Sequence, residues 1–206
     1  MATGQVHLDS YDDAGVLAAV ELVNAFAVGD AFGRRAHVQD PLATIARILV
    51  NDPPSVAQLR SSDTPGFVAL AGRLREVFED VRGGDVDGAA SRLNLLLAEH
   101  PAYPHLAKED GQWRLHHHPT DAALVPMYTS ICAEGLARII GAGGSARLGT
   151  CEGPACDRVY VDVSKNASRR FCSTACQNRV KAAAFRRRQE RVHPRAKTER
   201  STTWQT

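Results

Sequence analysis

Residues 151–188 read CEGPACDRVYVDVSKNASRRFCSTACQNRVKAAAFRRR and hold four of the chain's five cysteines. The cysteines form two close pairs that are separated by 15 residues. Tetrahedral zinc requires four thiolates at about 2.3 Å from one point, and two close pairs can supply them. The spacing therefore predicts one structural zinc ion (Zn2+) per chain in a closed site, with the ligands Cys151, Cys156, Cys172 and Cys176.

The residues around the cysteines also predict the local structure of this segment. A Gly-Pro turn lies between the first two cysteines, and the second two are four residues apart, on one face of a helix start that Ser173 can cap. Between the pairs, VYVDVS alternates like a strand and SKNAS supplies a turn, so we expect a hairpin there. These features predict a treble-clef-like domain whose cysteine core is separate from the rest of the chain.

The helix that follows Cys172 is predicted to be strongly basic. Its sequence, STACQNRVKAAAFRRRQERV, contains six Lys and Arg residues and a single acid, Glu190. Because like charges on one helix repel, the pattern favours a polyanionic partner over a merely solvated face. We expect inward positions at Ala175, Val180, Ala183 and Ala184, and aromatic core positions at Tyr160, Phe171 and Phe185. The candidate nucleic-acid contacts are Lys165, Asn166, Ser168, Arg169, Arg170, Asn178, Arg179, Lys181, Arg186, Arg187 and Arg188.

The charge of the chain is divided unequally between its two parts. Residues 151–206 carry 13 Lys and Arg against 5 Asp and Glu, a balance of +8, whereas residues 1–150 have a balance of −6. The basic part is therefore the candidate for nucleic-acid binding, and we expect residues 1–150 not to bind it. The cysteine segment and the helix after it, which together form the predicted zinc finger, lack the interleaved aromatic residues of a base-stacking surface. This favours duplex DNA over RNA as the partner.

The cysteine segment resembles the CGNR-type zinc-finger family of bacteria. The family pattern D-x-S-x-N-x-S-R-R-aromatic-C is matched by DVSKNASRRFC, residues 162–172. Its Cys-Gly-Asn-Arg appears as CQNR, residues 176–179, with Gln177 in place of glycine. Upstream, ELVNAF and WRLH are similar to the ABATE domain that forms the N-terminal part of this family. The resemblance implies a stress-related transcription regulator of mixed α and β structure.

The N-terminal region is predicted to be mainly helical. Apolar periodicity predicts a helix over residues 14–28, and capping residues predict further helices that begin near Asp40, Thr64 and Asp85, with a weaker one after Pro53-Pro54. A long helix is expected from about Thr120 to Gly141, with Pro126 near its start or at a kink. GSARLGT, residues 144–150, is expected to be a glycine-rich joint.

Asp110-Gly111 predicts a β-hairpin with a type I′ turn. Such a turn sets the register, which pairs Glu109 with Gln112, Leu106 with Leu115, and His105 with His116. One face then carries Trp113 and His117, and we expect His117 to be a core histidine. The other face carries His105, His116 and His118, which either bind a metal or are polar aromatic residues on a surface strand.

These expectations define an α+β chain in three parts. They are a mainly helical ABATE-like domain with a β-hairpin over residues 1–148, a treble-clef-like CGNR-type zinc finger with a basic C-terminal helix over 149–193, and a flexible tail over 194–206. Cys132 is expected to be a small buried hydrophobe. Asn24 is expected to form a hydrogen bond inside the fold or to line a ligand pocket.

Two functions fit the sequence. The first is a DNA-binding regulator whose N-terminal domain senses a small-molecule effector or forms a homodimer. The second is a zinc-dependent adaptor that binds RNA or an acidic protein. Residues 1–150 contain no nucleophile–base motif and no glycine-rich phosphate loop, so we expect no enzymatic activity. The chain has no apolar run of membrane-spanning length and its first residues do not resemble a secretory signal, so we expect no membrane association and a place in the cytoplasm, at the nucleoid.

Overall fold

The computed structural model describes residues 14–101, 103–109, 111–117 and 122–192. The first residues of the chain, His118 and the tail predicted over 194–206 lie outside the described residues. Helices dominate the described chain and three small antiparallel strand pairs accompany them, so the α+β fold class is confirmed. None of the helices in these ranges has the length and apolar character that crossing a membrane requires.

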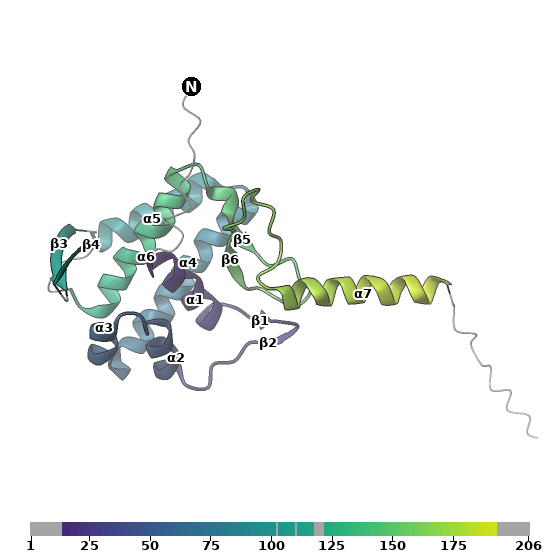
Figure 1. Ribbon diagram of the computed structural model, residues 1–206, viewed down its shortest axis with the longest axis horizontal. Helices are drawn as coiled ribbons and strands as arrows, with labels where there is room; N and C mark the ends of the chain where they lie inside the picture. Colours follow the sequence, from purple (N-terminus) through teal and green to yellow (C-terminus); the bar gives the residue numbers. More distant parts are fainter. Residues whose placement is uncertain (1–13, 102, 110, 118–121, 193–206) are drawn as a thin grey trace, which may run out of the picture.

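The elements follow one another from a helical N-terminal region to the cysteine-rich segment (Figure 1). The helices are α1 (Ala14–Phe26), α2 (Pro41–Ile48), α3 (Pro53–Gln58), α4 (Thr64–Gly83), α5 (Val86–Glu99), α6 (Leu124–Gly141) and α7 (Thr174–Val192). The strand pairs are β1 (Asp30–Ala31) with β2 (Arg34–Arg35), β3 (Pro104–Glu109) with β4 (Gln112–His117), and β5 (Leu148–Thr150) with β6 (Val159–Val161).

Four helices, α1, α4, α5 and α6, pack side by side around the main hydrophobic core. Phe67 and Phe78 of α4 are fully buried among apolar side chains from the other three helices. Helices α1 and α6 approach each other closely at Gly135, where a Cβ would lie 2.9 Å from Cγ2 of Val16. Only glycine at this position allows the two helices to come so near each other.

Aspartates start three of the helices, because each offers a carboxylate to the unpaired N–H groups of the first turn. The oxygen of Asp40 accepts from Ala43 at 2.9 Å, and Asp52 similarly caps α3. The helix starts predicted from Asp40, Pro53-Pro54 and Asp85 are confirmed. The helix predicted near Thr64 begins at Thr64 itself, after a short 3₁₀ turn at Ser61–Asp63.

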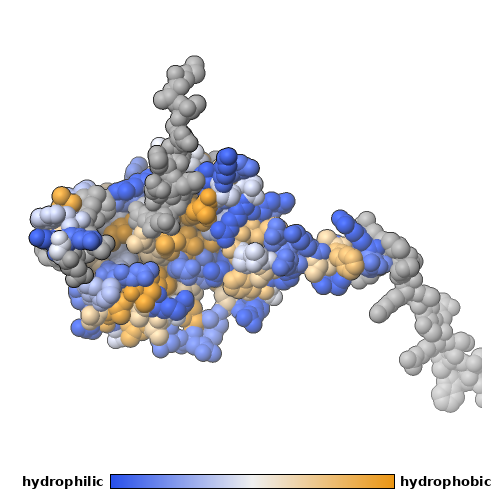
Figure 2. Space-filling model, viewed as in Figure 1, coloured by the Kyte–Doolittle hydropathy of each residue, from blue (hydrophilic) through white to orange (hydrophobic). Residues whose placement is uncertain are grey.

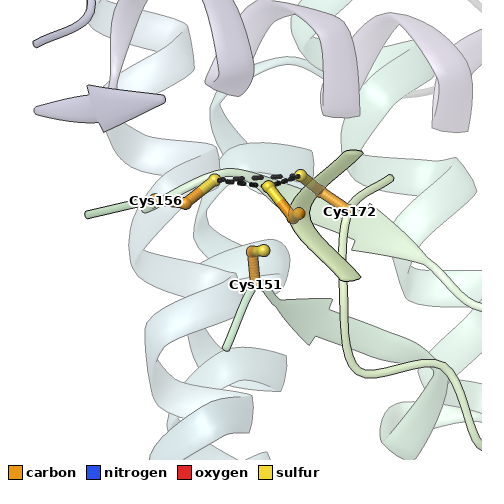
Figure 3. A group of neighbouring side chains, drawn as sticks. Cys151, Cys156 and Cys172 are labelled. Atoms are coloured by element: carbon orange, nitrogen blue, oxygen red, sulfur yellow. Dashed lines mark hydrogen bonds between the residues drawn. The ribbon is translucent and has the colours of Figure 1, made fainter. Parts of the chain in front are cut away.

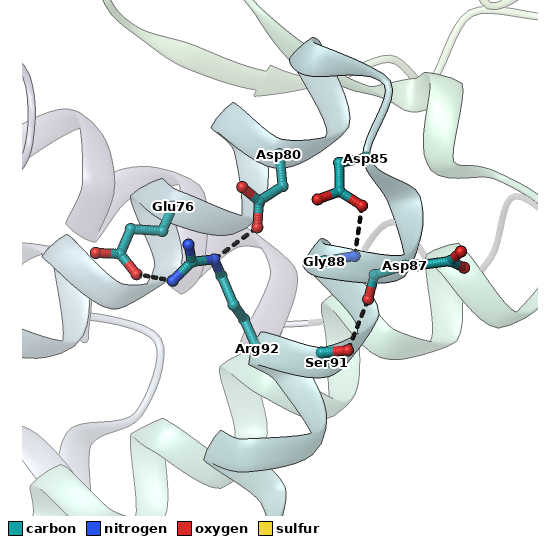
Figure 4. Close-up of polar contacts among 7 residues, drawn as sticks. All are labelled: Glu76, Asp80, Asp85, Asp87, Gly88, Ser91 and Arg92. Carbon is teal, nitrogen blue, oxygen red and sulfur yellow. Dashed lines mark hydrogen bonds and ion pairs between the residues drawn. The ribbon is translucent and has the colours of Figure 1, made fainter.

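The corner between α4 and α5 is held by both a cap and ion pairs (Figure 4). The carboxylate of Asp85 accepts the backbone N–H of Gly88 at 2.8 Å and caps α5. Arg92 of α5 reaches back to α4, where its Nε lies 2.6 Å from Asp80 and its guanidinium also pairs with Glu76. These contacts connect two adjacent helices of the core on the solvent side.

The β3–β4 hairpin has the predicted register, including the pairs Leu106 with Leu115 and His105 with His116. On the face that carries Trp113, Trp113 is 67% exposed and Leu106 is 63% exposed. The burial of His117 lies outside what the structure describes, so its assignment as a core histidine stays a prediction. The hairpin lies at the edge of the molecule, at the end opposite α7 (Figure 1).

Three other boundaries differ from the sequence predictions. Helix α6 begins at Leu124 rather than near Thr120, and Pro126 occupies its first turn, where the missing N–H has no helical partner to lose. The predicted joint at 144–150 contains a 3₁₀ turn (Ser145–Arg147) and the strand β5. The β1–β2 hairpin was not predicted. Its turn contains Phe32 at φ 54°, a conformation that is costly for an aromatic residue.

Candidate zinc centre and basic helix

The sulfur atoms of Cys151, Cys156, Cys172 and Cys176 all lie within 4.8 Å of one another. Figure 3 shows how the labelled sulfurs converge from separate segments of the chain. Three of the sulfur–sulfur distances are 3.7–3.8 Å, among Cys156, Cys172 and Cys176. Four sulfurs at 2.3 Å from a tetrahedral zinc lie about 3.8 Å apart, so the donor set and its geometry both fit zinc.

The first cysteine pair is held by a tight turn that follows β5. Ala155 has a left-handed backbone conformation, with φ 48°, which turns the chain before Cys156. The N–H of Gly153 points at the sulfur of Cys151, 3.4 Å away. A Cβ at Gly153 would lie 3.3 Å from the Cβ of Cys176, so a larger residue there would crowd the second pair.

The second pair lies at the start of α7, where the hydroxyl oxygen of Ser173 accepts the backbone N–H of Cys176 at 3.3 Å. The predicted N-cap is confirmed.

Burial opposes the ionisation of three of these thiols. Burial raises the pKa of Cys151, and it raises the pKa of Cys172 even more strongly, with the charge of Cys151 adding to the effect. Burial also opposes ionisation of Cys156, but the backbone N–H groups of Phe32 and Arg158 outweigh it and lower the pKa of that thiol. Crowded thiols cannot all ionise without compensation, and a bound divalent metal would supply it.

The segment between the cysteine pairs is organised by one buried carboxylate. Asp162 is 1% exposed, and its oxygens accept the N–H groups of Ser164 at 2.8 Å and Arg169 at 2.6 Å. Burial raises the pKa of Asp162, but these hydrogen bonds outweigh it and hold the pKa below its ordinary value. The strand predicted at VYV and the turn predicted at SKNAS are confirmed, and the N–H of Ala167 also donates to the carbonyl oxygen of Ser164 at 3.3 Å. The predicted hairpin is wrong, because β6 pairs instead with β5, on the other side of the first cysteine pair.

Three of the predicted nucleic-acid contacts have partners inside the protein. Arg169 donates to the carbonyl oxygens of three residues around the turn and lies 4.7 Å from the ring of Tyr160. Arg170 forms an ion pair with Glu152. Arg179 is half-buried and donates to the carbonyl oxygen of Pro154 in the first cysteine turn. These arginines stabilise the finger itself.

The other predicted contacts are exposed. They are Lys165, Asn166, Ser168, Asn178, Lys181, Arg186, Arg187 and Arg188. Among the side chains that the structure describes, no carboxylate forms an ion pair with Lys165, Lys181 or Arg186–Arg188. Helix α7 projects from the body (Figure 1), and both hydrophilic and apolar residues line its free length in Figure 2. Two predicted buried positions are wrong. Phe185, on the free length of α7, is 61% exposed, and Ala175 in the first turn is also exposed.

The finger is joined to the N-terminal region by a buried amide. Asn24 of α1 donates to the carbonyl oxygen of Val159 at 3.0 Å and accepts the N–H of Val159 at 2.8 Å. The predicted internal hydrogen bond of Asn24 is confirmed. Leu148 and Val159 belong to the main core, whereas the cysteines form a small cluster of their own. The cysteine cluster is thus separate from the main core, whereas β5 and β6, the strands on either side of the first cysteine pair, contribute residues to the main core.

A second set of contacts joins the finger to the β1–β2 hairpin. The N–H of Asp30 donates to the carboxylate of Asp157 at 2.9 Å, and the N–H of Asp157 donates to the carbonyl of Asp30 at 2.8 Å. Gly33 donates to the carbonyl of Ala155 at 2.8 Å, and Arg75 of α4 donates to that of Asp157. Sequence reasoning missed this set. The only local signal was the glycine after Phe32, which suits a two-residue turn.

Among the described residues, the histidines of the β3–β4 hairpin are not grouped so that they could hold a metal ion. The ring Nδ1 of His105 lies 3.1 Å from the carbonyl oxygen of Tyr103. His116 is placed opposite His105 only by the register of the strands, and His118 lies outside the described residues. A histidine metal site therefore stays a prediction. Cys132, in contrast, is fully buried in the main core, as expected.

Two family models match the chain. The model described as "CGNR zinc finger" matches residues 147–189. The model described as "Putative stress-induced transcription regulator" (ABATE) matches residues 17–143, which is more than half of the chain. The chain belongs to this family. The ABATE and CGNR matches meet between α6 and β5, and they confirm the resemblance inferred from the sequence. No curated protein matches the chain.

Proposed function

We propose that this ABATE-family protein is a transcription regulator that binds duplex DNA through its zinc finger and α7. One structural zinc per chain, ligated by the four cysteines, would hold the turn and the start of α7 in place. The proposal assigns the protein a binding role rather than an enzymatic one, in the cytoplasm at the nucleoid. A homodimer formed through the N-terminal region remains part of the proposal.

The observation that carries this proposal is the set of exposed cations that have no carboxylate partner among the side chains that the structure describes. Lys181 and Arg186–Arg188 lie along a helix that projects into solvent, where each cation is free to meet a phosphate. Lys165 lies in the turn that precedes the same helix. Asn178 is exposed one turn from the start of α7, where an amide can read a base edge if the helix enters a groove.

The proposal is tested by measuring binding of the zinc-loaded full chain to duplex DNA over a range of salt concentrations. Each phosphate contact contributes roughly −0.9 to the log–log slope of affinity against salt. Arg187→Ala should weaken binding to all sequences alike and reduce the magnitude of the slope by about one. Arg73→Ala is the matched control, because Arg73 is paired with Glu99 on the N-terminal helices and should leave the slope unchanged.

Sequence preference is tested with Asn178→Ala on a duplex selected from random DNA and on a scrambled duplex. We expect a loss of about 1–3 kcal/mol on the selected duplex only. Equal losses of binding free energy on both duplexes would mean that α7 binds DNA without sequence preference. The adaptor function would replace the proposal if a matched single-stranded RNA competed better than any duplex, or if neither variant changed DNA binding.

A further inference from the structure

A hollow of about 740 Å³ lies where the N-terminal helices meet the finger. Its walls come from α1, α2, the β1–β2 hairpin and the loop that leads from β2 to α2, with one residue from the finger. Figure 1 shows these elements on the same side of the molecule, away from the free length of α7. The volume is in the range of small-molecule sites, which is about 300–1,000 Å³.

The lining of this hollow is rich in arginine. Arg34, Arg35, Arg47 and Arg158 line it, from β2, from α2 and from the finger. The acids on the lining are Glu21 and Asp40, and Asp40 already accepts a hydrogen bond as the cap of α2. Among the described residues, Arg34, Arg47 and Arg158 form no ion pair, and the carboxylate of Asp30 lies 3.7 Å from Arg35. The hollow therefore has an excess of positive charge.

Within the described chain, Arg158 is the arginine of this lining that has a buried, unsatisfied donor. It is half-buried, and its Nε is buried with no hydrogen-bond partner in the described part of the chain. Its guanidinium lies 4.9 Å from the centre of the Phe32 ring, and Phe32 has the costly left-handed conformation of the β1–β2 turn. Buried polar groups are nearly always satisfied, so a positioned guanidinium whose Nε–H has no acceptor among the described residues points to a ligand that would offset its cost.

We propose that this hollow binds a small anionic molecule that carries phosphate or carboxylate groups. Guanidinium groups bind both kinds of oxyanion through paired hydrogen bonds. Such a ligand would touch α2, the β1–β2 hairpin and Arg158 at once. Arg158 directly precedes Val159, whose backbone is paired with Asn24 on the same lining. Binding would therefore strengthen the attachment of the finger to the N-terminal helices. This site does not depend on the proposed DNA-binding function.

The site is tested by titrating the zinc-loaded full chain with inorganic phosphate, and separately with sulfate, at constant ionic strength. Arginine Nε–H signals are followed by nuclear magnetic resonance. The Arg158 and Arg47 signals should shift and saturate with phosphate. Arg47→Ala should weaken this binding about tenfold, because a hydrogen bond to a charged group is lost. Arg186→Ala on α7 is the matched control and should leave the titration unchanged. Shifts that do not saturate, or equal weakening in both variants, would overturn the proposal.

A second arm separates a small-molecule site from an extension of the DNA surface. Duplex DNA affinity is measured for Arg47→Ala and Arg186→Ala, and circular dichroism checks that both variants are folded. We expect Arg186→Ala to lose affinity and Arg47→Ala to keep it. If Arg47→Ala lost as much, the arginines of the hollow would belong to the DNA surface and the proposal would be wrong. If the unaltered protein bound no DNA, only the proposed function would fail.

Discussion

Asn24 shows how one polar residue in an apolar helix connects two parts of the chain. Its amide both donates to and accepts from the backbone of Val159, so neither backbone group of that residue is left unpaired. Asn24 is 6% exposed and Val159 is 1% exposed. Removing the amide would leave a buried donor and a buried acceptor that water cannot reach.

We expect Asn24→Ala to lower the free energy of unfolding by about 2–4 kcal/mol, from two buried groups left unsatisfied. The measurement is urea denaturation of the zinc-loaded protein, followed by circular dichroism. Asn94→Ala on the exposed side of α5 is the control, and its effect should be within about 0.5 kcal/mol. Similar values for the two variants would show that the Asn24 contacts contribute little.

At the scale of elements, the contact between α1 and α6 depends on a glycine in the middle of α6. A Cβ at Gly135 would meet Cγ2 of Val16 at 2.9 Å and the backbone nitrogen of Val16 at 3.2 Å. Val16 is 2% exposed and lies within the main core, so its side chain has little room to move away. Gly72, in the middle of α4, has open space where a Cβ would be placed.

These two glycines make a matched pair of substitutions. Gly135→Ala should lower the free energy of unfolding, because overpacking costs about 1–3 kcal/mol and outweighs the gain in helix propensity. Gly72→Ala should raise it by about 0.5–1 kcal/mol, since only the propensity changes. Urea denaturation measures both. If both substitutions changed the free energy of unfolding in the same direction, this result would contradict the close approach of α1 and α6.

Elements with a strong local signal were predictable, and short ones were not. The Asp110-Gly111 pair in the sequence predicts the register that β3 and β4 have, and the aspartate caps mark where helices begin. Strand β5 has three residues, too few for a periodic pattern, and it forms because β6 and α4 lie beside it. The β1–β2 turn depends on Phe32 in a conformation that propensity disfavours, so only its tertiary contacts explain it.

The candidate site was predictable to a similar extent. Four sulfur ligands can surround one metal ion in few geometries, so the spacing of the cysteines in the sequence was enough to identify the cluster. Charge, in contrast, does not say whether an arginine meets a partner molecule or a carbonyl of its own chain. Arg169 and Arg179 donate to carbonyl oxygens of the finger, and those oxygens face them only after the chain has folded.

At the scale of the whole molecule, the finger and the N-terminal helices form a continuous structure. Strands β5 and β6 carry the cysteine turn on one side and contribute Leu148 and Val159 to the main core on the other. Strand β5 packs against α4, and β6 packs against α1. Loss of the metal is therefore expected to affect helices that do not touch it, which revises the expectation of an independent finger.

Chelation of the metal should unfold the cysteine turns and loosen α1 and α4. We expect the opening free energy of amides in these two helices to fall by about 1–2 kcal/mol, which hydrogen exchange measures segment by segment. The β3–β4 hairpin lies at the opposite end of the molecule and serves as the internal control (Figure 1). Unchanged exchange in α1 and α4 after complete removal of the metal would mean that the finger folds independently.

Because α7 is long, a small rotation at the base of the finger moves the far end of this helix by a large distance. Arg187 lies 13 residues beyond Thr174, the first residue of this 19-residue helix, which is about 20 Å at about 1.5 Å per residue. A rotation of about 10° at the helix start would move Arg187 by about 3.5 Å, which is close to the rise of about 3.4 Å along the duplex axis per phosphate of one strand. In the proposed complex with DNA, contacts that hold the base of the finger, such as those of Asp157 with Asp30, would therefore influence which phosphate the arginines meet.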